Sequence, residues 1–225
     1  MRIRRALLPL ALTLVACMLL TAGWVAYQVT DPGAGQRQHA VQDRLQHQWR
    51  AATQTAHRAG PGGTGAAGAQ NPDHLRLATG QPFAFIRVPA FGTGWKFAIV
   101  EGTGLSQLAL GPGHVPGTGL PGQPGNFVVA AHDVTAGNPF MHLGSLRHPD
   151  RVFIYTRTHT YEYAVHAKRV VRYTDVKVED PVPGRSPGDA PRATITLITC
   201  TPVTLAFTPW RIVVTGELIR TEARA

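Results

Sequence analysis

Three polar residues that could form a nucleophilic site, Cys200, His132 and Arg211, each lie at one end of a predicted strand. Cys200 follows the strand-favouring run 194–199, and His132 follows the apolar run 127–131. A thiolate can attack a carbonyl carbon, an imidazole can carry the proton, and a guanidinium can stabilise the oxyanion that forms. These residue types together therefore indicate acyl-transfer chemistry.

These residues can meet only if their strands are suitably arranged. Two parallel neighbours in a small barrel would bring His132 and Cys200 to the same rim. The short connection 201–209 favours an antiparallel partner for the Cys200 strand, which would place Arg211 at that rim too. Taken singly, each residue has an equally good structural interpretation, such as a packed thiol, a core histidine or a surface charge. Their coincidence at strand ends favours a site.

Residues 81–225 predict a β-rich domain. The 24 glycines and 18 prolines, with only 16% charged residues, are typical of a fold with many short strands and turns. We expect a helical turn at 105–110, a helix at 138–146 and an exposed loop at 175–191. Seven or eight short strands with little helix predict a mainly β fold, either a closed barrel or a sandwich. The strand-like runs are 83–89, 96–100, 127–131, 151–157, 161–173, 194–199 and 210–218.

The first residues predict a membrane anchor. Three arginines within residues 1–5 precede an uncharged, mainly apolar run at 6–27, which is long enough to cross a bilayer as a helix. We therefore expect residues 1–5 in the cytoplasm and the catalytic domain outside the cell. A cleaved signal peptide or a lipid-attachment site at Cys17 is the alternative. Because Cys17 is the only other cysteine, Cys200 has no disulfide partner in its own domain.

Residues 28–80 are expected to link the anchor to the domain. Apolar residues recur at helical spacing within 36–58, which predicts a short juxtamembrane helix, and the Gly-rich run 60–72 predicts a flexible segment. The net charge of +9 does not indicate nucleic-acid binding, because more than half of the excess precedes residue 81 and no basic cluster is interleaved with aromatics. There is no HExxH and no paired Cys/His spacing, so we predict neither a metal nor a cofactor.

Several segments resemble the sortases, the membrane-anchored cysteine transpeptidases of Gram-positive bacteria. TLITC (196–200) matches the TLxTC signature of that family. The loop GPGHVPGTGLPGQPGN (111–126) followed by FVVAAH is similar to the segment that leads to the sortase histidine, and WRIVVTGEL (210–218) is similar to the strand that carries the sortase arginine. The likeness extends from about Pro82 to Leu218 and includes the order His, Cys, Arg.

The resemblance implies a sortase β-barrel and assigns a role to individual residues. Cys200 would be the nucleophile, His132 the general acid, and Arg211 the cation that orients the substrate or stabilises the oxyanion. Thr199 resembles the threonine beside the nucleophile, a candidate donor to the substrate or intermediate. His114 is a candidate substrate-binding residue at the rim, with a role in shaping its loop as the alternative.

Within the family, the sequence is most similar to class E, which is associated with LAxTG-like rather than LPxTG sorting signals. The implied partners are secreted proteins that carry such a signal and an amine of a peptidoglycan precursor. Two departures stand out: Val115 follows His114 where class E sequences often carry Tyr, and Ala131 and Asp133 flank His132 where Gly and Arg are usual. They bear on signal preference and on the surroundings of the histidine.

Three other interpretations are weighed against this one. An L,D-transpeptidase normally has its cysteine in a Ser/Thr-His-Gly-Cys context, which Ile198-Thr199 does not match. A papain-like peptidase has its nucleophile before its histidine, the reverse of the order here. A membrane-tethered binding module, or an inactive sortase relative with a structural Cys200, stays open because of Ala131 and Asp133.

Overall fold

The structure is a computed structural model of the whole chain, and it describes residues 17–21, 23, 33–59, 77–180, 192–203 and 208–224. The predicted membrane span at 6–27 and the flexible segment at 60–72 lie largely or wholly outside these residues. Within the described ranges, no helix is both long enough and apolar enough to cross a membrane.

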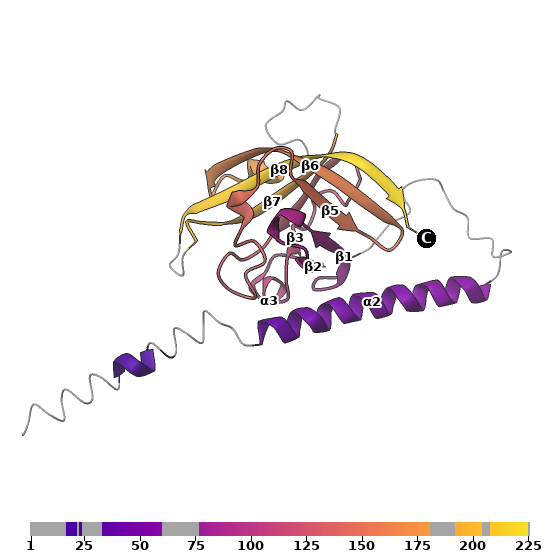
Figure 1. Cartoon of the computed structure of the whole chain (residues 1–225), viewed down its shortest axis with the longest axis horizontal. Coiled ribbons are helices and arrows are strands. Elements are labelled where there is room, and N and C mark those ends of the chain that lie inside the picture. Colours follow the sequence, from indigo (N-terminus) through magenta and orange to yellow (C-terminus); the bar gives the residue numbers. More distant parts are fainter. Residues whose placement is uncertain are drawn as a thin grey trace, which may run out of the picture.

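Eight strands form one closed barrel (Figure 1). Their order around the barrel is β1-β2-β3-β4-β7-β8-β6-β5. The closed barrel, predicted from the sequence as one of two β architectures, is thereby confirmed. Two pairs of neighbours are parallel, β2 with β3 and β4 with β7, and the other pairs are antiparallel. The elements are α2 (Ala34–Ala59), β1 (Pro82–Arg87), η1 (Pro89–Phe91), β2 (Lys96–Glu101), α3 (Leu105–Leu108), β3 (Gly113–His114), β4 (Gly125–Ala130), η2 (Leu143–Ser145), β5 (Arg151–Tyr155), β6 (His159–Arg172), η3 (Val176–Glu179), β7 (Ala193–Thr201) and β8 (Trp210–Ala223).

The barrel interior holds the main core. Alternate residues of β4 and β7 point into it, so Phe127, Val129, Ile195 and Leu197 are buried together there. Residues of opposite parity point outward, where Ile198 joins a second apolar cluster on the outer face of the sheet. Because the side-chain period of a strand is two, Cys200 shares the outer face with Ile198.

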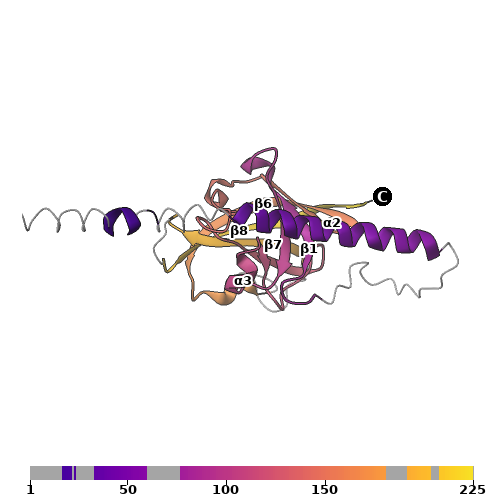
Figure 2. The ribbon, with the colours of Figure 1, turned by 90° about the horizontal axis from the view of Figure 1, so that it is seen from below.

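Helix α2 packs along one side of the barrel, as the two perpendicular views show (Figure 2). Val41 and Leu45 are buried against β1 and β2, and the Trp49 ring meets the Phe85 ring edge-on with the ring centroids 5.3 Å apart. The helix predicted at 36–58 is therefore present. The sequence analysis placed it in the linker, apart from the domain, but its apolar face packs against the barrel.

The prediction of a helix at 138–146 is wrong. Only the single 3-10 turn η2 forms there, because Gly137 and Asn138 have positive φ angles of 77° and 55° and Pro139 disfavours a helical residue before it. The segment instead crosses the end of the barrel, and Phe140 lies fully buried in the core with its N–H donating to the His132 carbonyl at 3.0 Å.

Candidate active site

Cys200 lies one residue before the end of β7 and is a free, half-buried thiol. The antiparallel register between β7 and β8 pairs Cys200 directly with Arg211. The predicted antiparallel relation of these two strands is therefore confirmed. Directly paired residues on neighbouring strands have Cβ atoms about 4.5–5.5 Å apart, so the thiol and the base of the arginine side chain are close neighbours.

His132 reaches the same rim from the parallel neighbour. β4 and β7 pair in register up to Ala130 and Ile198, and the Ala131 N–H donates to the Ile198 carbonyl at 3.1 Å. The chain then leaves the sheet at His132, beside Thr199 and Cys200. The structure thus brings the three residues singled out for acyl transfer to one rim of the barrel, through the parallel pair that the sequence reasoning required.

Thr199 connects the two strand ends that carry these side chains. Its hydroxyl is buried and donates to the Ala131 carbonyl at 2.7 Å. The hydroxyl is therefore engaged with the backbone next to His132. We therefore assign Thr199 a positioning role, alongside the donor role that the resemblance implies.

Backbone carbonyls close to it in the sequence and one aromatic ring hold the Arg211 side chain in place. Its Nη1 donates to the carbonyls of Thr208 and Trp210, both at 2.8 Å, and its guanidinium carbon lies 5.9 Å from the centroid of the Tyr173 ring. These contacts fix the planar head of the side chain near the strand-paired thiol. A guanidinium has five N–H donors, so donors remain for a substrate oxygen after these two bonds.

Asp133 is a residue of the site that the sequence reasoning did not assign a role. The side chain is only 3% exposed, and its Oδ2 atom has no hydrogen-bond partner among the described residues. Burial raises the pKa of this carboxyl, while backbone N–H groups and the charges of His132 and Arg211 act in the opposite direction. The signal available in the sequence was an acidic residue directly after the candidate histidine, where its charge must act on the ring.

The electrostatics of the site favour the neutral thiol and the neutral imidazole. Burial raises the pKa of the Cys200 thiol; Arg211 opposes this shift and Asp133 adds to it. Burial lowers the pKa of His132, and the Asp133 charge only partly offsets it. Both shifts follow from desolvation, which disfavours whichever form is charged. The free protein therefore holds the thiolate–imidazolium pair in a smaller fraction of molecules than ordinary pKa values would give.

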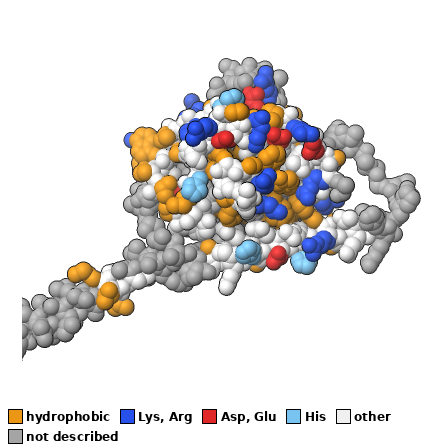
Figure 3. Space-filling view, in the orientation of Figure 1, with side chains coloured by type: hydrophobic (Ala, Val, Ile, Leu, Met, Phe, Trp, Pro, Cys, Tyr) orange, Lys and Arg blue, Asp and Glu red, His pale blue; other side chains and the backbone are white. Residues whose placement is uncertain are grey.

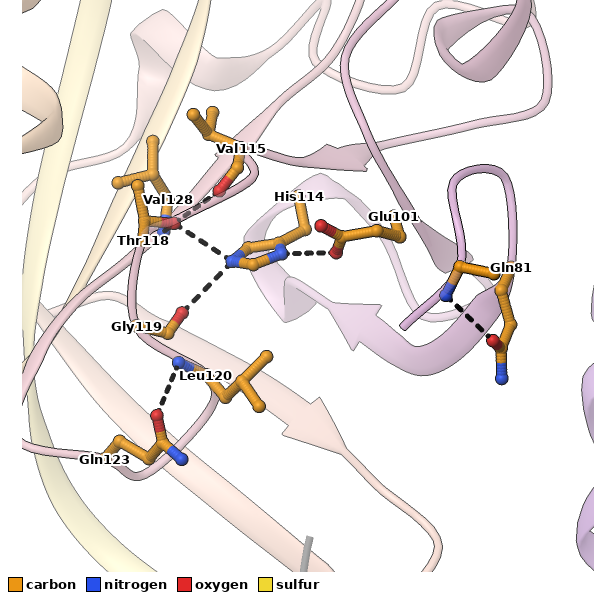
Figure 4. Close-up of polar contacts among 10 residues, drawn as sticks. Gln81, Glu101, His114, Val115, Thr118, Gly119, Leu120, Gln123 and Val128 are labelled. Atoms are coloured by element: carbon orange, nitrogen blue, oxygen red, sulfur yellow. Dashed lines mark hydrogen bonds and ion pairs between the residues drawn. The ribbon is translucent and has the colours of Figure 1, made fainter. Parts of the chain in front are cut away.

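His114 lies within the barrel end and shapes the loop that follows it (Figure 4). The residue is 2% exposed; its Nδ1 contacts Glu101 Oε2 at 2.6 Å, and its Nε2 contacts the Thr118 hydroxyl at 2.9 Å and the Gly119 carbonyl at 3.1 Å. The ring also packs against Phe127, with centroids 5.3 Å apart. These contacts suit the loop-shaping alternative, because the ring bonds to two residues of the loop that follows it.

A cavity of about 200 Å³ lies on the outer face of the barrel, and its lining includes Arg211, the strand partner of Cys200. Val178, Ile198 and Val213 of the outer apolar cluster line it. Its charged lining residues are Arg172, Asp175, Glu179 and Arg211. Because Ile198 and Cys200 share this face, the cavity leads toward the thiol. Among the described residues, no group of three or more His, Cys, Asp or Glu could hold a metal ion.

The fold and the site together define a class: a closed β-barrel in which a cysteine, a histidine and an arginine from three strand ends share one rim. The profile of the sortase domain family matches residues 86–219, and the chain belongs to that family.

Known proteins agree with this assignment. The chain is 32% identical to sortase SrtE1 of Streptomyces coelicolor over 155 residues, which cover 65% of this chain and 43% of that protein. It is 33% identical to sortase A of Bacillus anthracis over 101 residues, which cover 44% of this chain and 43% of that protein. The matched segments therefore span less than half the length of these two relatives.

Solved sortase structures are similar to the barrel of this chain. Sortase E from Streptomyces avermitilis is 36% identical with a TM-score of 0.59, and the match covers 65% of this chain and 93% of that one. Sortase E1 from Streptomyces coelicolor, solved with a tripeptide in the active site, is 29% identical with a TM-score of 0.58 and covers 66% and 94%. The predicted resemblance to class E is thereby confirmed.

Proposed function

We propose that the protein is a cysteine transpeptidase that cleaves a sorting signal of the LAxTG or LPxTG type between Thr and Gly and transfers the protein to a peptidoglycan amine. The observation that carries this proposal is the cross-strand pairing of Cys200 with Arg211, with His132 at the end of the parallel neighbour. Family membership and the structure of a related sortase with a tripeptide in its active site support it.

The first half of the reaction forms a thioester. The Cys200 thiolate attacks the carbonyl carbon of the signal threonine, and the Arg211 guanidinium stabilises the resulting oxyanion. The His132 imidazolium then donates its proton to the glycine nitrogen as the C–N bond breaks, so the glycine leaves as a neutral amine. The side chains that precede the threonine would lie against Ile198 and Val213 in the cavity that Arg211 also lines.

The second half reverses these roles. Neutral His132 accepts a proton from the incoming amine, whose nitrogen attacks the thioester carbon, and the thiolate leaves. Atoms balance over the cycle, because one amide is broken and another is formed. The charge of Arg211 acts on the second tetrahedral intermediate in the same way as on the first.

Residues 6–27 are proposed to anchor the protein in the cell membrane with the barrel on the outer side, where secreted proteins and peptidoglycan precursors are accessible. The apolar run preceded by arginines supports this arrangement. A measurement of anchoring is fractionation of cells that express the chain, with protease added from outside. Loss of the barrel under external protease supports the arrangement, and full protection in intact cells contradicts it.

The activity is tested with the full chain in non-ionic detergent and paired LAxTG and LPxTG peptides that carry a fluorophore and a quencher. We expect cleavage, a mass increase on Cys200 corresponding to a thioester, and ligation when an amine is added. Cys200→Ala should abolish all three, whereas the matched control Cys17→Ala removes the other free thiol and should leave them intact. Retained cleavage by Cys200→Ala contradicts the mechanism. Absence of a thioester with every peptide favours the binding-module alternative.

A further inference from the structure

A second cavity, of about 470 Å³, lies between α2 and the barrel. Barrel strands β1, β2 and β5, with Arg224 directly after β8, supply one wall, and α2 supplies the other through Gln46, Trp49 and Arg50. In the barrel order, β1 and β5 lie on the side away from the β4–β7 pair that carries His132 and Cys200. This cavity is therefore separate from the candidate active site and is not used by the proposed reaction.

The charged groups that line this cavity are all cations. Arg50, Arg87, Lys96 and Arg224 line it, and no acidic residue does. None of the four forms an ion pair with an acidic residue in the part of the chain that the structure describes. Figure 3 shows Lys and Arg side chains gathered among hydrophobic side chains on the face of the barrel above α2. Four uncompensated cations around one cavity create a local positive potential.

Aromatic rings and a backbone carbonyl hold two of these cations in place. Lys96 Nζ lies 4.3 Å from the centroid of the Phe85 ring. The Arg224 guanidinium lies 5.2 Å from the Trp49 centroid and 5.6 Å from the Tyr155 centroid, and its Nη1 donates to the Thr156 carbonyl at 2.7 Å. The cationic heads are thus oriented before any ligand binds, which reduces the entropy lost on binding.

The cations also repel one another. Partial burial lowers the pKa of Lys96, and the charge of Arg224 lowers it further. A bound anion would remove this repulsion and favour the charged lysine. A multiply charged oxyanion suits such a set best, because arginine forks bind two oxygens at once and lysine adds a compact charge.

We propose that this cavity is a binding site for a phosphoryl group, carried either by a soluble phosphate compound or by a lipid headgroup. A phosphate group fills only part of the cavity, whose volume lies within the range of about 300–1,000 Å³ that ligand pockets occupy. The remaining space beside Trp49 and Tyr155 accommodates the group to which the phosphate is attached. A ligand here contacts α2 and the barrel simultaneously and therefore joins them.

The proposal is tested by titration calorimetry of the full chain in dodecyl maltoside at low ionic strength. The probes are inorganic phosphate, inorganic pyrophosphate and dioctanoyl phosphatidylglycerol. Binding of phosphate or pyrophosphate identifies a site for soluble phosphates, and binding of the lipid alone identifies a headgroup site; both support the proposal. Absence of binding by all three probes at millimolar concentration overturns it.

Variants locate the binding. Lys96→Gln and Arg87→Gln should each weaken binding about tenfold, because each removes a charge-assisted contact. The matched control Arg147→Gln removes the same charge from an exposed arginine that does not line the cavity, and it should bind as the wild type does. Cys200→Ala should also bind normally, since the site is independent of the reaction. Equal loss in Arg147→Gln and Lys96→Gln, or no loss in either cavity variant, contradicts the assignment.

Discussion

The bond between the Thr199 hydroxyl and the Ala131 carbonyl fastens the nucleophile strand to the residue before His132. Thr199→Val removes the donor while nearly preserving shape, and it leaves a buried carbonyl without that partner. Such a loss costs about 1–3 kcal/mol. For a chain of this size each kcal/mol lowers Tm by about 2–4 °C, so a loss near the middle of the range lowers Tm by about 4–8 °C.

The effect on the reaction should exceed the effect on stability. If the backbone at His132 moves by a fraction of an ångström, proton transfer is misaligned, and a displacement of about 1 Å can reduce the rate a hundredfold. We therefore expect kcat for peptide cleavage to fall by about 10–100-fold with KM nearly unchanged. Thr199→Ser, which keeps the hydroxyl, should restore most of the activity.

The chain offers a matched control for this prediction. The Thr194 hydroxyl donates to the Gly125 carbonyl at 3.0 Å, at the opposite end of the same β4–β7 pair. Thr194→Val removes the same kind of bond far from the thiol, so it should lower Tm with little change in kcat. The two measurements are thermal unfolding and steady-state cleavage below Tm. Equal kcat losses in both valine variants, or no rescue by serine, would refute the positioning role of Thr199.

Three further predictions concern the pH profile, the charge of Asp133 and helix α2. Burial lowers the pKa of His132 and raises that of Cys200. A plot of kcat/KM against pH should therefore be flat in the middle, fall on the acid side below about pH 6.5 and fall on the alkaline side above about pH 8.5. A pH optimum narrower than this interval contradicts the roles assigned to the two residues. Asp133 raises both pKa values, so Asp133→Asn should move both flanks to lower pH, and flanks that move in opposite directions would show that its charge does not act on both groups. Gln38→Ala removes the buried hydrogen bond from α2 to the Ala136 carbonyl (2.6 Å) in the loop after His132. The variant should therefore increase amide hydrogen exchange in that loop. Exchange equal to that of the wild type would show that α2 does not restrain the loop through this bond.

The sequence was sufficient to predict the rim that carries the candidate site. The runs before His132 and Cys200 are uniformly apolar or β-branched, as expected for strands buried on both faces, and such strands are commonly parallel. The short link to Arg211 then left an antiparallel return as the simplest connection. These are local patterns, so a reader of the sequence alone can recover them. The register that pairs Cys200 with Arg211 was not predicted and comes from the structure.

Other parts depend on contacts between distant segments, which local patterns do not specify. The role of His114 was open because its partner Glu101 belongs to another strand, and the ring's burial depends on barrel closure. The same holds for α2: its apolar stripe was visible, but nothing local indicated that β1 and β2 would cover it. The helix expected at 138–146 failed because the positive φ angles at Gly137 and Asn138 override apolar spacing.

The proton of the Cys200 thiol must move before the thiol can attack. Burial disfavours both charged partners of the thiolate–imidazolium pair, and Asp133 opposes the thiolate, so Arg211 is the one group among those acting on the pKa of Cys200 that favours its ionised form. With ordinary pKa values of about 8.5 and 6.5, roughly one molecule in a hundred holds the charged pair at pH 7, and each further unit of separation lowers that share tenfold. Arg211 therefore has two proposed tasks, to favour the thiolate before attack and to stabilise the oxyanion after it. Replacing Arg211 should therefore reduce the rate of peptide cleavage by more than the loss of either task alone would predict.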